Sequence, residues 1–178
     1  LRNYLREVQH GYENPSAKGS PVLTLFGMLR GAEGSQSLLI VDDARSREPA
    51  AVELRDGVRI DPVTGTAQEG AKFDVELLQA GMTFPLRFEL LIPKDKDEVA
   101  LKQALVQALH GFEEGEIPLG ARKRRGFGRC RVSGWQVTTY DLTKSDGIVA
   151  WLREEENGTP TKAVPIAEGL GVTLPEAD

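Results

Sequence analysis

The stretch from Gly120 to Arg131 constrains this chain more than any other, because it concentrates positive charge in an otherwise acidic sequence. It reads G-A-R-K-R-R-G-F-G-R-C-R, and its six cationic residues are Arg122, Lys123, Arg124, Arg125, Arg129 and Arg131. Without these six, 16 Lys and Arg would remain against 27 Asp and Glu, and no acid occurs from Ile117 to Tyr140. A positive patch on an acidic body is the electrostatic signature of a polyanion site.

Three residues inside this stretch indicate a shaped loop rather than a simple basic tail. Gly126 and Gly128 permit positive φ and a close approach of another backbone. Phe127, between them, offers a flat face on which a base can stack. The alternative is a solvated Gly-rich hairpin whose charges only maintain solubility, since charge runs are usually exposed faces. A nucleotide-binding P-loop is excluded, because the spacing G-x-x-x-x-G-K-[ST] does not occur.

Length and composition narrow the class of protein. The 178 residues are enough for one domain with its own hydrophobic core. The single cysteine, Cys130, cannot form an internal disulfide, and with only two histidines it cannot complete a Cys/His zinc site, so a cytoplasmic setting is expected. No apolar run approaches about 18 residues and no signal-peptide pattern is present, so we expect neither membrane insertion nor export.

Apolar periodicity predicts a helix at the start of the chain. Leu1, Tyr4, Leu5 and Val8 fall at i, i+3, i+4 and i+7, which is one face of a helix. No capping residue precedes this face, so we expect an earlier strand and loop upstream of Leu1. A loop from His10 to Pro21 and an apolar run from Val22 to Leu29 follow.

A compact apolar run, Ser37–Val41, predicts a buried strand that is followed by Asp42 and Asp43. Two adjacent acids at a strand end can ligate a metal ion. More often they cap a turn or pair with nearby cations, here Arg45 and Arg47, and we favour that structural role.

The next stretch, Ala44–Gly70, is polar and rich in turn residues, which predicts a long loop. Pro62 and Gly65 frame a turn within it. Three donors in this loop are suited to RNA phosphate or ribose: Arg59, Thr64 and Thr66.

Two alternating runs, Phe73–Leu78 and Met82–Ile92, predict an antiparallel hairpin that turns at Gly81. Lys94–Phe112 then has helical periodicity, and His110 near its end is expected to interact with the terminal carbonyls.

Beyond the basic stretch, the apolar phase from Arg129 to Thr139 slips at Gly134, which predicts one strand with a bulge. Asp141–Leu152 predicts a helix that Asp141 or Thr143 caps. We therefore divide the chain into a domain over residues 1–152 and a tail or peripheral arm over residues 153–178.

The order of these elements is typical of an α+β, ferredoxin-like (RRM-like) βαββαβ domain with long insertions and without its first strand. That fold supports recognition of single-stranded RNA on its sheet and loops. Fold alone does not establish function, so the motifs must carry it.

Four segments, in order, resemble the RAMP superfamily of CRISPR-associated proteins. Residues 119–132 resemble its C-terminal Gly-rich loop, and L-R-N-Y-L-R-E at the start resembles the helix after its early S-L-K-G-x-L-R signature. L-F-G followed by L-L-I-V-D-D-A resembles its LFG and DA block. R-I-D-P-V-T-G-T-A with F-D-V-E-L-L-Q-A-G-M-T-F resembles the central region of type III backbone subunits. The resemblance extends from about Leu1 to Leu152.

This resemblance implies a subunit, or a domain of a fused subunit, of a type III RNA-guided effector complex in the prokaryotic cytoplasm. Its implied partners are CRISPR RNA, target RNA and other CRISPR effector subunits or fused RAMP domains. The six loop cations would neutralise phosphates, with Gly126, Phe127 and Gly128 shaping the contact and Arg59, Thr64 and Thr66 adding a second set. In such subunits a thumb-like hairpin also interrupts the guide–target duplex at intervals.

The resemblance also implies that any RNA cleavage uses an aspartate in a loop before the first helix and a divalent ion, Mg²⁺ or Mn²⁺. That aspartate would lie upstream of Leu1, so no catalytic residue, metal ligand or cofactor is assigned within this chain, and Asp42 and Asp43 do not replace it. Two alternatives remain. One is a metal-independent, guide-processing endoribonuclease with His10 or His110 as general base, and the other is a purely architectural subunit.

Overall fold

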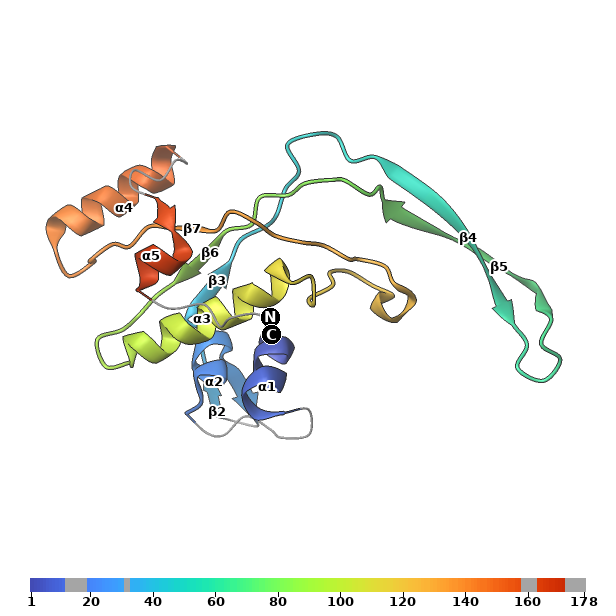
Figure 1. Cartoon of the computed structure of the whole chain (residues 1–178), viewed down its shortest axis with the longest axis horizontal. Coiled ribbons are helices and arrows are strands. Elements are labelled where there is room, and N and C mark those ends of the chain that lie inside the picture. Colours follow the sequence, from blue (N-terminus) through green and yellow to red (C-terminus); the bar gives the residue numbers. More distant parts are fainter. Residues whose placement is uncertain (12–18, 31–32, 158–162, 172–178) are drawn as a thin grey trace. The chain divides into compact units, whose positions relative to one another are not determined.

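The computed structural model describes residues 1–11, 19–30, 33–157 and 163–171, and the chain divides into two compact units (Figure 1). The first unit comprises Leu1–Leu39 and Leu90–Asp178, and the second comprises Ile40–Glu89. The basic stretch therefore lies in the first unit, whereas Arg59, Thr64 and Thr66 lie in the second.

Three helices build the core of the first unit: α1 (Arg2–His10), α2 (Pro21–Phe26) and α3 (Glu98–Glu113). Each helix contacts the other two. Their buried side chains form one apolar cluster, which consists of Leu5, Val22, Leu25, Leu101, Ala104 and Ala108. Burial of this cluster supplies the main driving force for folding of the unit. The helices predicted at the start of the chain and before the basic stretch are confirmed.

Local capping sets the ends of two of these helices. The Asp97 carboxylate accepts a hydrogen bond from the Ala100 amide at 3.0 Å, so α3 begins at Glu98 and not at Lys94 as predicted. The apolar run from Val22 was not predicted to be helical, yet α2 begins at Pro21. The Ser20–Pro21 pair is the sequence feature that indicates the start of this helix. The Ser20 hydroxyl accepts a hydrogen bond from the Leu23 amide, and the proline occupies the first turn. Most of the predicted loop before it lies outside the described residues.

The described strands form four two-stranded sheets. In the first unit, β1 (Met28–Arg30) pairs with β2 (Glu33–Ser35), and β7 (Gln136–Val137) pairs with β8 (Val164–Pro165), both antiparallel. The strand predicted at Ser37–Val41 is present as β3 (Leu39–Val41), which pairs with β6 (Phe88–Leu90). The prediction that this strand is buried holds only for Leu39, since Ile40 and Val41 are exposed. This mixture confirms the α+β class, while the single ferredoxin-like βαββαβ sheet stays a prediction.

The second unit is a long antiparallel hairpin of β4 (Val52–Ile60) and β5 (Ala67–Leu78). The predicted loop over 44–70 is therefore wrong at residues 52–60 and 67–70, which are strand. The predicted pairing of Phe73–Leu78 with Met82–Ile92 is also wrong, because β5 pairs with β4 and only β6 is a strand in the later run. The turn framed by Pro62 and Gly65 is confirmed between the two strands.

Side chains across the hairpin explain this pairing. Gly57 stands opposite Phe73, and the Phe73 ring occupies the space that a Cβ at Gly57 would need. On the other face, Lys72 forms an ion pair with Asp56 at 3.2 Å. The charges that made the segment look like a loop thus alternate with apolar residues along β4, as the pleat of a strand requires.

The C-terminal part of the first unit differs from the prediction in its strand. Only Gln136–Val137 is a strand, so the bulged strand from Arg129 to Thr139 is wrong, although Gly134 does have a positive φ of 72°. The predicted helix at Asp141–Leu152 is present as α4 (Ser145–Asn157). Asp141 precedes α4 and accepts from the Thr143 amide at 3.1 Å.

Past residue 152, the described segments are the end of α4, then β8 and α5 (Ile166–Leu170), which contacts β7, β8 and α3. The boundary at residue 152 between a domain and a tail stays a prediction. Within the described segments, no helix combines the length and the apolar character that crossing a membrane requires.

Candidate nucleic-acid interface

Backbone hydrogen bonds close the basic stretch into a loop at the C-terminal end of α3. The Leu119 amide donates to the Gly128 carbonyl at 2.9 Å, and the Val132 amide donates to the Phe112 carbonyl at 3.2 Å. The Cys130 thiol also donates to the Ile117 carbonyl at 3.3 Å. Phe112 and Ile117 are buried, so the loop stands on a packed base.

A single 3-10 turn, η1 (Lys123–Arg125), presents the central cations of the loop. The Arg125 amide donates to the Arg122 carbonyl at 2.8 Å, and the Gly126 amide donates to the Lys123 carbonyl at 3.0 Å. Arg122 has φ 56° and is, within the described segments, the one non-glycine residue with positive φ. Such a conformation costs an L-residue roughly 1 kcal/mol, so the loop holds a strained residue among its cations.

The two glycines of the loop, Gly126 and Gly128, have different surroundings. Both have positive φ, 82° at Gly126 and 76° at Gly128. A Cβ at Gly128 would overlap the Leu119 carbonyl oxygen, whereas a Cβ at Gly126 would meet open space. The close approach at Gly128 is therefore to the chain's own backbone. A role for Gly126 beside an RNA backbone stays a prediction.

Five of the six loop cations differ from several other cations of the described segments in having no acidic partner there. Among the described residues, ion pairs hold Arg45, Lys72, Arg87, Lys102 and Lys144 to carboxylates. No carboxylate of the described part pairs in this way with Lys123, Arg124, Arg125, Arg129 or Arg131, all of which are exposed. Phe127 is half-buried. The loop thus offers a concentrated and uncompensated positive charge to solvent, which is what a polyanion needs.

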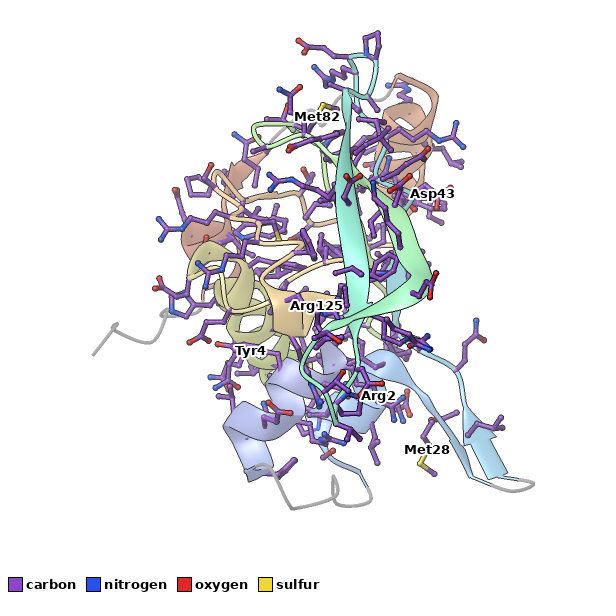
Figure 2. The ribbon with its side chains drawn as sticks, turned by 90° about the vertical axis from the view of Figure 1, so that its right-hand side faces the viewer. Arg2, Tyr4, Met28, Asp43, Met82 and Arg125 are labelled. Atoms are coloured by element: carbon purple, nitrogen blue, oxygen red, sulfur yellow. The ribbon has the colours of Figure 1, made fainter. Side chains whose placement is uncertain are left out.

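Tyr4 of α1, labelled in Figure 2, forms a hydrogen bond with Glu116, which lies just before the basic loop in the sequence. The Tyr4 ring packs over Gly111 of α3, where a Cβ would collide with it. Burial raises the pKa of Tyr4 to about 12, assisted by its hydrogen bond to Glu116 and by the charges of Glu116 and Glu114. No local sequence pattern indicates this contact, because 112 positions separate its partners, from residue 4 to residue 116.

We expect the Tyr4 phenol to ionise near pH 12 when the ultraviolet absorbance of tyrosinate is titrated. Its proton is held more tightly in the folded chain than in the unfolded chain, where the pKa is near 10. This contribution to stability is complete below pH about 10 and is lost as the pH rises toward about 12. Tyr4→Phe should remove this phase of the titration, and its persistence in the variant would contradict the assignment.

The second set of predicted RNA contacts lies at the tip of the β4–β5 hairpin. Asp61 caps the turn by accepting from the Val63 amide at 2.8 Å and the Thr64 amide at 3.1 Å. These bonds hold the pKa of Asp61 below its usual range. The hydroxyls of Thr64 and Thr66 bond to each other at 2.8 Å, while Arg59 is exposed on β4. Their contact with RNA stays a prediction.

The remaining candidates occupy structural positions. Asp43 pairs with Arg45 at 3.8 Å, which confirms that predicted ion pair, whereas the partner of Asp42 is Arg87 at 3.3 Å and not one of the predicted cations, Arg45 and Arg47. His10 ends α1, and His110 Nδ1 lies 3.3 Å from Glu113 rather than being bonded to terminal carbonyls. In the described part of the chain, no three His, Cys, Asp or Glu side chains gather as metal ligands would. These residues do not fit a Mg²⁺ or Mn²⁺ ion, and no catalytic step is derived through one.

Comparison with protein families gives one match, to the RAMP superfamily, over residues 1–131. The comparison with curated proteins gives no match. The matched residues include α1, α3 and the whole basic loop as far as its last cation, Arg131. This match covers well over half of the chain, and the chain therefore belongs to the RAMP superfamily.

Proposed function

We propose that the chain is an RNA-binding subunit, or a domain of a fused subunit, of a type III CRISPR effector complex in prokaryotic antiviral defence. Membership of the RAMP superfamily supports a CRISPR-associated role. The observation that carries the RNA-binding part is the set of loop cations that no described carboxylate neutralises. In this proposal, the loop from Gly120 to Arg131 holds the backbone of the CRISPR RNA.

The geometry of the loop suits a backbone contact better than a base-specific one. The cations are exposed, three of them on one short turn, and each can meet a phosphate without reading the base attached to it. Binding of this kind depends on release of counterions and falls steeply with salt. It suits a guide RNA, whose sequence varies while its backbone does not.

The test is a fluorescence anisotropy titration of single-stranded RNA with wild type and with Arg124→Ala plus Arg125→Ala, at several salt concentrations. We expect the double variant to bind about ten- to a hundredfold more weakly at low salt. The slope of log affinity against log salt should become shallower by about 1.4, since each phosphate contact to single-stranded RNA contributes about 0.7.

The matched control removes two exposed cations elsewhere, Arg45→Ala plus Lys96→Ala, which pair with Asp43 and Asp95. This control changes the net charge equally, so it should leave the salt slope nearly unchanged. An affinity that is insensitive to salt and to Arg124 and Arg125 would rule out the loop as an RNA site and favour an architectural subunit.

The β4–β5 hairpin supports a second part of the proposal, as the thumb-like element of such subunits. Its tip carries Pro62 and Val63, and the Val63 side chain is 92% exposed. An apolar side chain at the end of a long hairpin can enter between bases and unstack them. We expect Val63→Asp to leave binding of single-stranded RNA unchanged but to weaken binding of a guide–target duplex in the assembled complex. Equal effects on both RNAs would contradict the assignment.

Cleavage of target RNA, if the complex performs it, is not assigned to described residues of this chain. The metal-independent alternative, with His10 or His110 as base, is tested by assaying RNA cleavage in EDTA with both histidines replaced by alanine. Cleavage in EDTA that depends on these histidines would favour the processing endoribonuclease over the effector subunit.

A further inference from the structure

One edge of β4 has no strand beside it. Within the described segments, which include the whole of the second unit, the sheet that contains β4 has two strands, so β5 covers one edge of β4 and no strand covers the other (Figure 1). Apart from Gly57, every residue of β4 is exposed. A two-stranded ribbon alone is only marginally stable in water, and an open edge is a template for another strand.

Backbone hydrogen bonds show which residues of β4 face the open edge. The Gln79 amide donates to the Ala51 carbonyl at 2.9 Å, and beyond the other end of the strand the Asp61 amide donates to the Thr66 carbonyl at 2.9 Å. The amides and carbonyls of successive residues in a strand point to opposite edges, so the odd-numbered residues of β4 direct these groups toward β5. The residues that direct them outward are Val52, Leu54, Asp56, Val58 and Ile60.

The two outer edges of the hairpin differ in their side chains. The apolar residues on the open edge of β4 are Val52, Leu54, Val58 and Ile60, and they are between 45% and 66% exposed. Opposite Leu54, Asp56 and Val58, the same face of β5 carries Glu76, Asp74 and Lys72. Charged side chains discourage pairing at an edge strand. The edge of β5 is therefore protected against another strand, whereas the edge of β4 is not.

The apolar residues of β4 match one another when two copies of the strand run antiparallel with Asp56 at the centre. In this register Val52 of one copy faces Ile60 of the other, and Leu54 faces Val58. All of these residues direct their backbone groups outward, so each facing pair can exchange two backbone hydrogen bonds. The same alignment thus satisfies the open backbone groups and places apolar side chains against apolar side chains.

Charge on the other face of the strand favours the same register. Glu53 of one copy faces Arg59 of the other, and Arg59 is exposed and has no carboxylate partner among the described residues. Glu53 is paired only with Arg55 of its own strand, at 2.7 Å. Sliding one copy by two residues would place Arg55 against either Arg55 or Arg59 of the other copy, and facing like charges are destabilising. Asp56 faces Asp56 at the centre, but Lys72 pairs with each of them at 3.2 Å.

We propose that a second copy of this chain pairs with the open edge of β4, so that two hairpins form one four-stranded antiparallel sheet about a two-fold axis at Asp56. Both copies use the same edge, so the contact closes at two copies. The apolar residues of the two β4 strands then form one continuous face. This inference concerns the second unit alone and does not depend on RNA binding by the basic loop.

Sedimentation equilibrium of the whole chain over a range of protein concentrations tests the pairing. We expect wild type to pass from monomer to dimer as the concentration rises. Glu53→Arg and Arg59→Glu should each raise the dissociation constant of the dimer about tenfold or more, because two repulsive pairs replace two attractive ones. The double variant, whose net charge equals that of wild type, should dimerise as wild type does. Glu76→Arg, at an exposed residue of β5, is the matched control and should leave the dimer intact.

A cysteine at the two-fold axis tests the register. In a Cys130→Ser background, Asp56→Cys places two cysteines opposite each other at a Cα spacing of roughly 5.5 Å, which a disulfide can bridge. Mild oxidation should link this variant into covalent dimers. Val52→Cys is the control, because its thiol would face Ile60 of the other copy and should form far fewer covalent dimers.

Three outcomes would overturn the inference. Wild type that stays monomeric at every concentration would show that the edge of β4 does not pair. A dimer that neither charge variant weakens would join through another surface, and equal crosslinking of Asp56→Cys and Val52→Cys would exclude the two-fold register. Equal far-ultraviolet circular dichroism of wild type and variants shows that the substitutions act on association and not on folding. The RNA titrations of the basic loop are separate, so failure of one proposal leaves the other standing.

Discussion

Replacing Gly128 with alanine is expected to abolish the shape of the basic loop and most of its affinity for RNA. The new methyl group would overlap the Leu119 carbonyl oxygen, which is part of the backbone and cannot rotate away. The Leu119 amide donates to the Gly128 carbonyl, so the same displacement breaks the bond that closes the loop. Positive φ adds roughly 1 kcal/mol of strain. We expect an RNA affinity at least about tenfold weaker, because the loop no longer holds its cations in one arrangement.

Gly126→Ala is the matched control for this prediction. Gly126 has a similar φ of 82°, but a Cβ there meets nothing within 4 Å. It should therefore cost only the backbone strain of roughly 1 kcal/mol and leave the loop closed. Urea unfolding measures the cost to stability, and anisotropy with single-stranded RNA measures the cost to binding. Equal losses in the two variants would mean that the Leu119–Gly128 contact does not shape the site.

Helical periodicity predicted the elements that build the platform of the site. The apolar face from Leu1 to Val8 and the face that includes Leu101, Leu105 and Ala108 both lie on helices, with Leu5 buried in α1 and those three residues buried in α3. These predictions succeed because the buried stripe of a helix is a local pattern with a period of 3.6 residues. The charge of the basic stretch and its placement after a helix were also readable, since six cations cannot be buried without partners.

Strand pairing was the part that the sequence did not predict. Gly81 lies between two alternating runs and made a hairpin there look natural, yet the partner of β5 is β4. A run of alternating apolar and polar residues indicates which face of a strand is apolar, but it does not indicate which strand pairs with it. The register that forms places Phe73 over Gly57 and Lys72 beside Asp56, and these contacts exist only between the two strands. The charged residues of β4 also made this segment look like a loop, because an exposed two-stranded ribbon needs no continuous apolar face.

The candidate site shows the same division between local and distant information. Its cations and glycines were predicted from one continuous stretch. The hydrogen bond between Tyr4 and Glu116 joins residues more than a hundred positions apart in the sequence. No spacing rule links such residues, because the packing of α1 on α3 brings them together.

Leu5→Ala is expected to destabilise the first unit by about 2–5 kcal/mol, the largest loss of stability among these variants. Leu5 is fully buried in the cluster that joins α1, α2 and α3. Truncation leaves a cavity at the centre of the platform without touching any cation of the loop. Below the unfolding transition, RNA affinity should therefore stay close to wild type, in contrast to Gly128→Ala. Urea unfolding and anisotropy on the same samples measure the two effects.

Amide hydrogen exchange shows which elements lose stability in Leu5→Ala. The β4–β5 hairpin belongs to the second unit and shares no side chain with the Leu5 cluster. Leu5→Ala should therefore speed exchange in α1, α2 and α3 while leaving exchange in β4 and β5 unchanged, because local stability follows local packing. Leu152→Ala, at a side chain that is 53% exposed, is the control and should change stability by less than about 1 kcal/mol. Faster exchange in β4 and β5 to the same degree would show that the two units unfold together.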